Sequence, residues 1–189
     1  MKSVIFSVFP ACGKTWLFKN QKKFGLKILD SDSSEFSWIK IIDEDYRQKN
    51  CNNPDYMPKY IKERNPDFPN NYINHIKENI GKYDYIFVSS HDVVRNALDE
   101  EGISFIIVYP NIDLKSEWIG RCFVREQNGE NGCTAKVMND NYDKWIKECT
   151  FVAETHPHII LGHNEYLSDY LMKNDTRYGY MMRNWGIEK

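Results

Sequence analysis

A glycine, a lysine and a hydroxyl residue stand in a row at Gly13-Lys14-Thr15, directly after an apolar stretch. The tripeptide alone occurs by chance in many proteins, but its position between an expected strand and an expected helix is typical of a phosphate-binding loop. In such a loop backbone N–H groups surround an anion, Lys14 reaches the β- and γ-phosphates and Thr15 holds Mg²⁺. The residues expected to bind these phosphates are Pro10, Ala11, Cys12, Gly13, Lys14 and Thr15.

Two positions depart from the glycine pattern of such loops. Val8 stands where the loop begins with glycine, and Ala11 where many loops have a second one. Glycine is required only where the backbone excludes other residues or where a side chain would collide with phosphate. Either the backbone tolerates both side chains, or the loop binds phosphate weakly. Cys12 is either a small loop residue or a thiol whose pKa the helix N-terminus lowers.

Two carboxylates flank a serine at Asp30-Ser31-Asp32, after a second expected strand over residues 26–29. Open parallel sheets bind ligands at the carboxyl ends of their strands. Asp30 would contact Mg²⁺ and substrate there, and Asp32 would contact substrate and accept the proton of its hydroxyl group. The alternative is a turn in which these polar side chains cap the next segment.

Arg121 and Arg125 are four residues apart and share one face of an expected helix, just before a glycine- and asparagine-rich stretch. Two guanidinium groups beside such a stretch suit a lid that stabilises the charge of transferring phosphates. The alternative is a solvated helix in which the two arginines pair with Glu117 and Glu126.

Aromatic and basic side chains are frequent between the second and third expected strands. Phe36, Arg47 and Arg64 are candidates for binding the acceptor, because aromatic rings stack on a base and arginine holds a phosphate. The same side chains would equally form the core of a small subdomain. We expect one or two helices in this segment, including one near residues 38–46.

The third expected strand ends at Ser89-Ser90-His91, where many nucleotide hydrolases carry an acid. Hydroxyl groups at this place favour a kinase over an ATP-driven motor. His91 would contact substrate or, as the simpler alternative, begin a helix.

Short apolar runs alternate with helical patterns along the chain, which predicts an α/β fold with a parallel sheet covered on both faces. We expect one domain over residues 1–189, with a substrate-binding insert at about 33–80 and a lid at about 113–135. The expected strands are residues 3–9, 26–29, 83–88, 103–109 and 158–161. The expected helices between and after them are residues 14–24, 72–80, 93–98, 113–126, 135–149 and 166–173.

The net charge of −2 disfavours nucleic acid as a partner, because no basic stripe accompanies it. No apolar stretch is long enough to span a membrane, and the N-terminal residues do not read as a signal peptide. The 5 cysteines show neither disulfide nor zinc spacing. We therefore expect a cytoplasmic protein without a membrane partner, and a homodimer is compatible with the sequence.

Together these residues resemble the P-loop kinases of the nucleoside monophosphate kinase and shikimate/gluconate kinase type, and the divergent nucleotide kinases encoded by phages. The resemblance implies a three-layer fold whose five-stranded parallel sheet has the order 2-3-1-4-5. It also implies ATP with Mg²⁺ as phosphoryl donor and a small acceptor. By the same resemblance Lys14 binds phosphate, Thr15 ligates Mg²⁺, Asp30 or Asp32 contacts metal and substrate, and Arg121 and Arg125 belong to the lid.

Three hypotheses remain open at this point. The first is phosphoryl transfer to a (deoxy)nucleoside monophosphate, with a small hydroxyl compound of the shikimate or gluconate kind as the alternative acceptor. The second is a nucleotide-binding protein without turnover, which the side chains at Val8 and Ala11 favour. The third is an ATPase, which the missing acid after the third strand disfavours.

Overall fold

The structure is a computed structural model that describes residues 3–130 and 132–174. Five parallel strands form its central sheet: β1 (Val4–Val8), β2 (Ile28–Asp30), β5 (Tyr85–Ser89), β6 (Ile106–Pro110) and β7 (His158–Leu161). These runs are rich in Ile, Val, Phe and Tyr, which suits strands buried on both faces of a parallel sheet.

The strands lie side by side in the order β2-β5-β1-β6-β7. These labels differ from the expected 2-3-1-4-5 because two further strands, β3 (Trp38–Ile42) and β4 (Tyr60–Arg64), form a separate two-stranded sheet. If only the central sheet is numbered along the chain, its order is second, third, first, fourth, fifth. Strand β1 is central and pairs with β5 on one side and β6 on the other.

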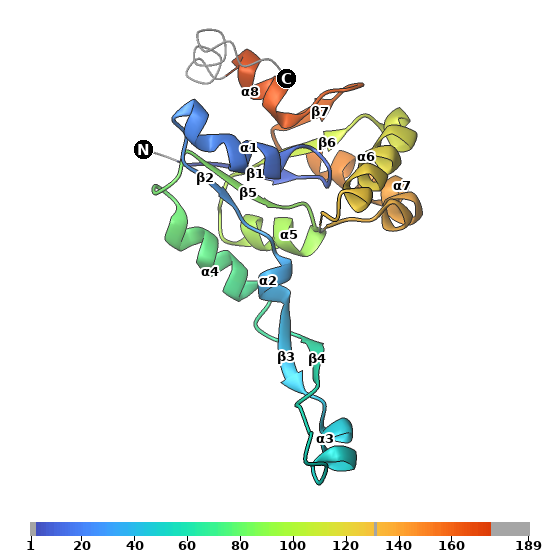
Figure 1. The fold of residues 1–189 in the computed structure, drawn as a ribbon. Helices are drawn as coiled ribbons and strands as arrows, with labels where there is room; N and C mark the ends of the chain where they lie inside the picture. Colours follow the sequence, from blue (N-terminus) through green and yellow to red (C-terminus); the bar gives the residue numbers. More distant parts are fainter. Residues whose placement is uncertain (1–2, 131, 175–189) are drawn as a thin grey trace.

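Helices lie on both sides of this sheet, so the predicted α/β class with a covered five-stranded parallel sheet is confirmed. Figure 1 shows α1 and α8 on one side of the strands and α4 and α5 on the other, while α6 and α7 lie against each other. The helices are α1 (Lys14–Asn20), α4 (Asn70–Asn79), α5 (Asp92–Glu100), α6 (Lys115–Gln127), α7 (Ala135–Ala153) and α8 (Leu167–Asn174), with short 3-10 helices η1 (Gln21–Phe24) and η2 (Ile112–Leu114).

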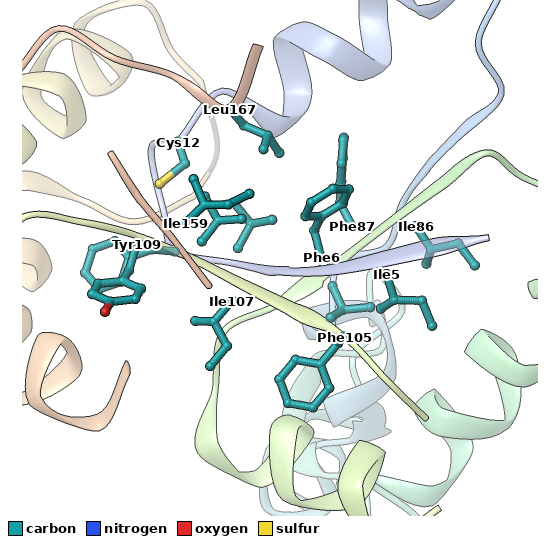
Figure 2. Packing of buried hydrophobic residues seen from close by; sticks show 14 of the residues in the cluster. Ile5, Phe6, Cys12, Ile86, Phe87, Phe105, Ile107, Tyr109, Ile159 and Leu167 are labelled. Atoms are coloured by element: carbon teal, nitrogen blue, oxygen red, sulfur yellow. The ribbon is translucent and has the colours of Figure 1, made fainter. Parts of the chain in front are cut away.

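The core is formed by the strands of the central sheet and the apolar faces of these helices. Figure 2 shows buried side chains packed around the sheet, among them Phe6, Phe87, Phe105 and Ile107. Leu167, at the start of α8, closes the core near Cys12. In the described part of the chain no helix is both long and apolar enough to cross a membrane.

The expected helix near residues 38–46 is wrong over its first half. Strand β3 (Trp38–Ile42) follows a short helix α2 (Ser34–Ser37) and pairs antiparallel with β4 (Tyr60–Arg64). The run W-I-K-I-I is rich in β-branched residues, which favours a strand. Helix α3 (Glu44–Asn50) then begins at the Asp43 side chain, which accepts a hydrogen bond from the Tyr46 N–H at 3.0 Å.

Residues 38–64 therefore make a hairpin with a helix near its tip, which we call the arm. Figure 1 shows the arm projecting away from the central sheet. The other expected elements are present with boundaries shifted by a few residues, as at the start of β6 at Ile106 and the end of α7 at Ala153.

Candidate functional site

The loop between β1 and α1 is held in place by hydrogen bonds that its carbonyl oxygens accept from other parts of the chain. Each of three consecutive carbonyls accepts a hydrogen bond from a distant part of the chain: Pro10 from Trp118 Nε1 at 3.0 Å, Ala11 from Arg121 Nη1 at 3.3 Å, and Cys12 from the Leu167 N–H at 3.0 Å. Within the described part of the chain, the backbone N–H groups of residues 11–16 donate to no acceptor. A run of N–H groups without partners at a helix start is the arrangement that binds an anion.

The valine at the first glycine position of the motif needs no glycine. Val8 is the last residue of β1, is 1% exposed, and lies in register with Ser89 and Val108. Its backbone is that of an ordinary strand, so the alternative in which the backbone tolerates this side chain is supported.

Ala11 and Gly13 do have the left-handed backbone that favours glycine. Ala11 has a φ of 61° and Gly13 a φ of 92°. A Cβ atom added at Gly13 would lie 3.2 Å from the Cδ1 atom of Tyr166, so packing as well as backbone selects glycine there. Ala11 carries the moderate cost of a methyl group in this region.

Restoring glycine at the two departing positions is expected to have opposite effects on stability. Val8→Gly removes a buried side chain from a strand and should lower the free energy of unfolding by about 2–4 kcal/mol. Ala11→Gly relieves a left-handed alanine and, after the larger entropy of the unfolded chain is subtracted, should raise it by about 0.5–1 kcal/mol. Urea denaturation of both variants checks this, and equal signs would contradict it.

Lys14 folds back onto the strand that precedes the loop. Its Nζ atom donates to the Val8 carbonyl at 3.1 Å. Burial lowers the pKa of Lys14 below its ordinary value, and the carboxylate of Asp30 opposes that shift. The ammonium group is thus held beside the N–H groups of the loop, where a phosphate would replace a carbonyl as its partner.

Asp30 ends β2 at the carboxyl edge of the sheet, close to the first turn of α1. The Thr15 hydroxyl donates to Asp30 Oδ2 at 3.4 Å. Burial raises the pKa of Asp30 above its ordinary value, and Lys14 works in the opposite direction. Oxygen donors of this kind suit Mg²⁺, which takes one or two protein ligands and completes its shell with water and phosphate.

The described residues contain no cluster of three or more acidic, histidine or cysteine side chains able to hold a metal. Thr15 and Asp30 are therefore the residues that would hold Mg²⁺ together with a bound phosphate. Asp32 is exposed, and its Oδ1 atom accepts a hydrogen bond from the Ser34 N–H at 2.9 Å. Asp32 thus forms the turn considered as the alternative, and its second oxygen makes no hydrogen bond within the described residues.

Arg121 pairs with Glu117, as the alternative to a lid predicted, but it is nearly buried and not part of a solvated helix face. Its guanidinium lies between the rings of Trp118 and Tyr166, 3.8 and 4.0 Å from their centroids, and its side chain is 9% exposed. Its Nη2 atom donates to Glu117 at 2.5 Å and to the Glu165 carbonyl at 2.9 Å. Because Arg121 also donates to Ala11, we infer that it positions the loop.

Arg125 lies one turn further along α6 and is more exposed. Its Nε atom is 3.6 Å from a carboxylate oxygen of Glu130, in the glycine-rich stretch that follows the helix. Glu126, the other partner named in the alternative, accepts a hydrogen bond from the Ala135 N–H at 2.9 Å. Arg125 is the more exposed of the two arginines, and it lines the cavity of the site.

These groups line one cavity of about 970 Å³ at the carboxyl edge of the sheet. The predicted site residues that line it are Pro10, Ala11, Cys12, Gly13, Lys14, Thr15, Asp30, Asp32, Arg121 and Arg125. Cavities of this size hold ligands as large as a nucleotide. The structure thus brings together the loop of residues 10–15, the two carboxylates and the two arginines, which lie far apart in the sequence.

The three predicted acceptor-binding residues of the insert do not line this cavity. Phe36 packs against the rings of Tyr72 and His75, so it belongs to a small core. Arg47 pairs with Glu44 at 3.1 Å on the arm, and Arg64 lies over Trp38 at the root of the arm. The subdomain alternative therefore describes Phe36 better than substrate binding does.

Polar residues at strand and helix ends complete the cavity. Ser34, Ser89 and Ser90 line it, together with His91, which begins α5. The sequence offered a substrate contact for His91 and noted the hydroxyl groups at Ser89 and Ser90, but it gave Ser34 no role. The pKa of His91 is lowered by burial. The signal that could have found Ser34 is its place shortly after the end of β2, since adjacent parallel strands end at the same edge.

Cys12 is not a reactive thiol. Its side chain is 1% exposed and packs in the core. Burial raises the pKa of Cys12 to about 12, in spite of the nearby Lys14 and Arg121. The alternative in which the helix N-terminus lowers this pKa is wrong, because desolvation outweighs the nearby positive charges.

The site as a whole places the loop of residues 10–15, two carboxylates and two arginines around one cavity. Its position at the carboxyl ends of β1, β2 and β5 is the usual ligand position of an open parallel sheet. Compared with models of known protein families and with curated proteins, the sequence gives no match.

Proposed function

We propose that this protein transfers a phosphoryl group from ATP to a small acceptor, with a (deoxy)nucleoside monophosphate as the first candidate. The observation that supports the proposal most is the hydrogen bonding of the loop of residues 10–15. The carbonyl oxygens of residues 10–12 accept hydrogen bonds from distant parts of the chain, while the N–H groups of residues 11–15 donate to no acceptor among the described residues. Lys14, Asp30 and Asp32 line the same cavity. This set can bind a nucleotide phosphate and position an acceptor beside it.

Each residue then has a distinct task in the proposed reaction. The loop N–H groups and Lys14 bind the β- and γ-phosphates. To do so, Lys14 gives up its hydrogen bond to the Val8 carbonyl and donates to a phosphate oxygen in its place. Thr15 and Asp30 hold the Mg²⁺ that, when bound, neutralises charge on the phosphates. Asp32 accepts the acceptor proton, and Arg125 stabilises the transferring group.

A hydroxyl compound without phosphate is the second candidate acceptor. Arg47 and Arg64, which would have held the phosphate of a nucleoside monophosphate, lie outside the cavity. Serine and histidine side chains line it instead, at Ser34, Ser90 and His91. These groups suit hydrogen bonding to a neutral or weakly charged acceptor.

ATP consumption measured with Mg²⁺ against a panel of nucleosides, nucleoside monophosphates and small hydroxy acids tests the proposal. We expect consumption that depends on one class of acceptor. Intact ATP binding without acceptor-dependent consumption would overturn the proposal in favour of a nucleotide-binding protein. Consumption that no acceptor changes would indicate an ATPase.

The activity should fall on the acid side at a pH above the ordinary Asp pKa of 3.8, because burial raises the pKa of Asp30 and the reaction needs its carboxylate. A pH profile of kcat/KM for ATP checks this. The position of the acid limb should change in the residual activity of Asp30→Asn and stay the same in His91→Gln. A wild-type limb at or below 3.8 would contradict the assignment.

A further inference from the structure

The arm is a sheet that the rest of the described chain leaves uncovered. Strands β3 and β4 pair only with each other, and every residue of β4 is exposed. A two-stranded hairpin is marginally stable alone in water, so an arm with this many exposed apolar residues suits contact with a partner. Figure 1 shows that its strands extend beyond the helices that cover the central sheet.

The register sorts the arm's side chains into two chemically different faces. Residues directly opposite in an antiparallel pair share a face. One face is formed by three cross-strand pairs, which we call the cationic face: Trp38 with Arg64, Lys40 with Lys62, and Ile42 with Tyr60. The other face is formed by Ile39 with Glu63 and Ile41 with Ile61. All strand cations therefore lie on the cationic face and the strand carboxylate lies on the other.

The centre of the cationic face carries a like-charge pair. Lys40 lies directly opposite Lys62, an arrangement that destabilises a hairpin. Neither lysine forms an ion pair among the described residues. A polyanion seated on this face would remove the repulsion, because its charges would lie between the two ammonium groups.

Aromatic rings flank this pair at both ends of the face. Trp38 is 45% exposed and Tyr60 is 57% exposed. The guanidinium of Arg64 lies 5.2 Å from the centroid of the Trp38 ring. Exposed rings interleaved with cations are the features by which proteins bind single strands, since bases stack on the rings and phosphates contact the cations.

We propose that the cationic face binds single-stranded nucleic acid. Trp38 and Tyr60 stack on bases, while Lys40, Lys62 and Arg64 contact phosphates. The net charge of −2, which disfavours such a partner for the whole chain, does not apply to a face whose charges are all positive. The proposal does not rest on phosphoryl transfer.

Fluorescence anisotropy with the full chain, without ATP, tests it on labelled oligo-dT and oligo-rU of about 20 nucleotides and on a duplex of the same length. We expect single strands to bind more tightly than the duplex, and the two sugars distinguish DNA from RNA as the ligand. Trp38→Ala should weaken binding at least about fivefold. Lys40→Gln with Lys62→Gln should reduce the slope of log affinity against log salt by about 1.4.

Matched controls lie on the same arm. Glu63→Gln on the opposite face and Lys49→Gln in α3 should leave Trp38-dependent binding and its salt slope nearly unchanged. The lysine double variant removes a repulsion, so it should keep its circular dichroism spectrum. The proposal is overturned if oligonucleotides do not bind, if neither variant of the cationic face weakens binding, or if only vesicles of anionic lipid bind.

Discussion

Lys14→Met is expected to lower kcat/KM for ATP by about 10²–10³-fold, because the proposed reaction uses the positive charge of Lys14 beside the transferring phosphate. The same substitution should raise the stability of the ligand-free protein. The ammonium group of Lys14 is desolvated, as the lowering of its pKa by burial indicates, and methionine of similar length carries no charge into that place. Steady-state kinetics and urea denaturation on one preparation measure both effects.

Lys19→Met is the matched control, since Lys19 lies on the same helix and is exposed. It should change neither quantity. A Lys14→Met protein with wild-type turnover would remove the phosphate loop from the mechanism. A variant that loses activity and stability together would show that Lys14 stabilises the fold. One hydrogen bond from Lys14 to the Val8 carbonyl does not predict that result.

Glu117→Ala is expected to cost about 3–5 kcal/mol of unfolding free energy, because it leaves the nearly buried guanidinium of Arg121 without its carboxylate. Glu117 is 16% exposed and also accepts hydrogen bonds from His163 Nδ1 at 2.7 Å and the Asn164 N–H at 3.1 Å. Thermal and urea denaturation measure the loss. Glu44→Ala, which breaks an exposed ion pair on the arm, is the control and should leave the midpoint nearly unchanged.

The same carboxylate makes stability depend on pH in a defined direction. Burial alone would raise the pKa of Glu117. The hydrogen bonds from Arg121 and His163 outweigh the effect of burial, so the pKa of Glu117 lies below its ordinary value of 4.5. The stabilisation is therefore complete above pH 4.5 and is lost as the pH falls through the lower folded-state pKa. Glu117→Ala should remove this part of the acid sensitivity. An unchanged acid profile would contradict the assignment.

The sequence predicted the parts of the site that one stretch of chain specifies. Gly13-Lys14-Thr15 follows a continuous apolar run, so the strand, the loop and the helix start could each be assigned from local pattern. Asp30 was found because polar residues that end a buried strand lie at the ligand edge of a parallel sheet. These predictions depend on neighbours along the chain, which a sequence displays directly.

The role of Arg121 could not be read in the same way. Its stacking between Trp118 and Tyr166 joins α6 to the segment before α8, and spacing along one helix does not reveal such a contact. The arm was misassigned for a related reason. Residues 38–42 carry both helical and strand propensity, and the pairing with residues 60–64 decides between them.

The root of the arm has a consequence for how this protein can change. The Asn65 N–H donates to the Ser37 carbonyl at 3.0 Å, and the side-chain amides of Asn65 and Asn71 both donate to the Phe36 carbonyl at 2.9 Å. The two chain ends that enter the arm are thus clamped side by side on the body. Because the junction holds the entry and the exit of the arm together, the arm can be shortened or resurfaced while the loop, the carboxylates and the cavity keep their geometry.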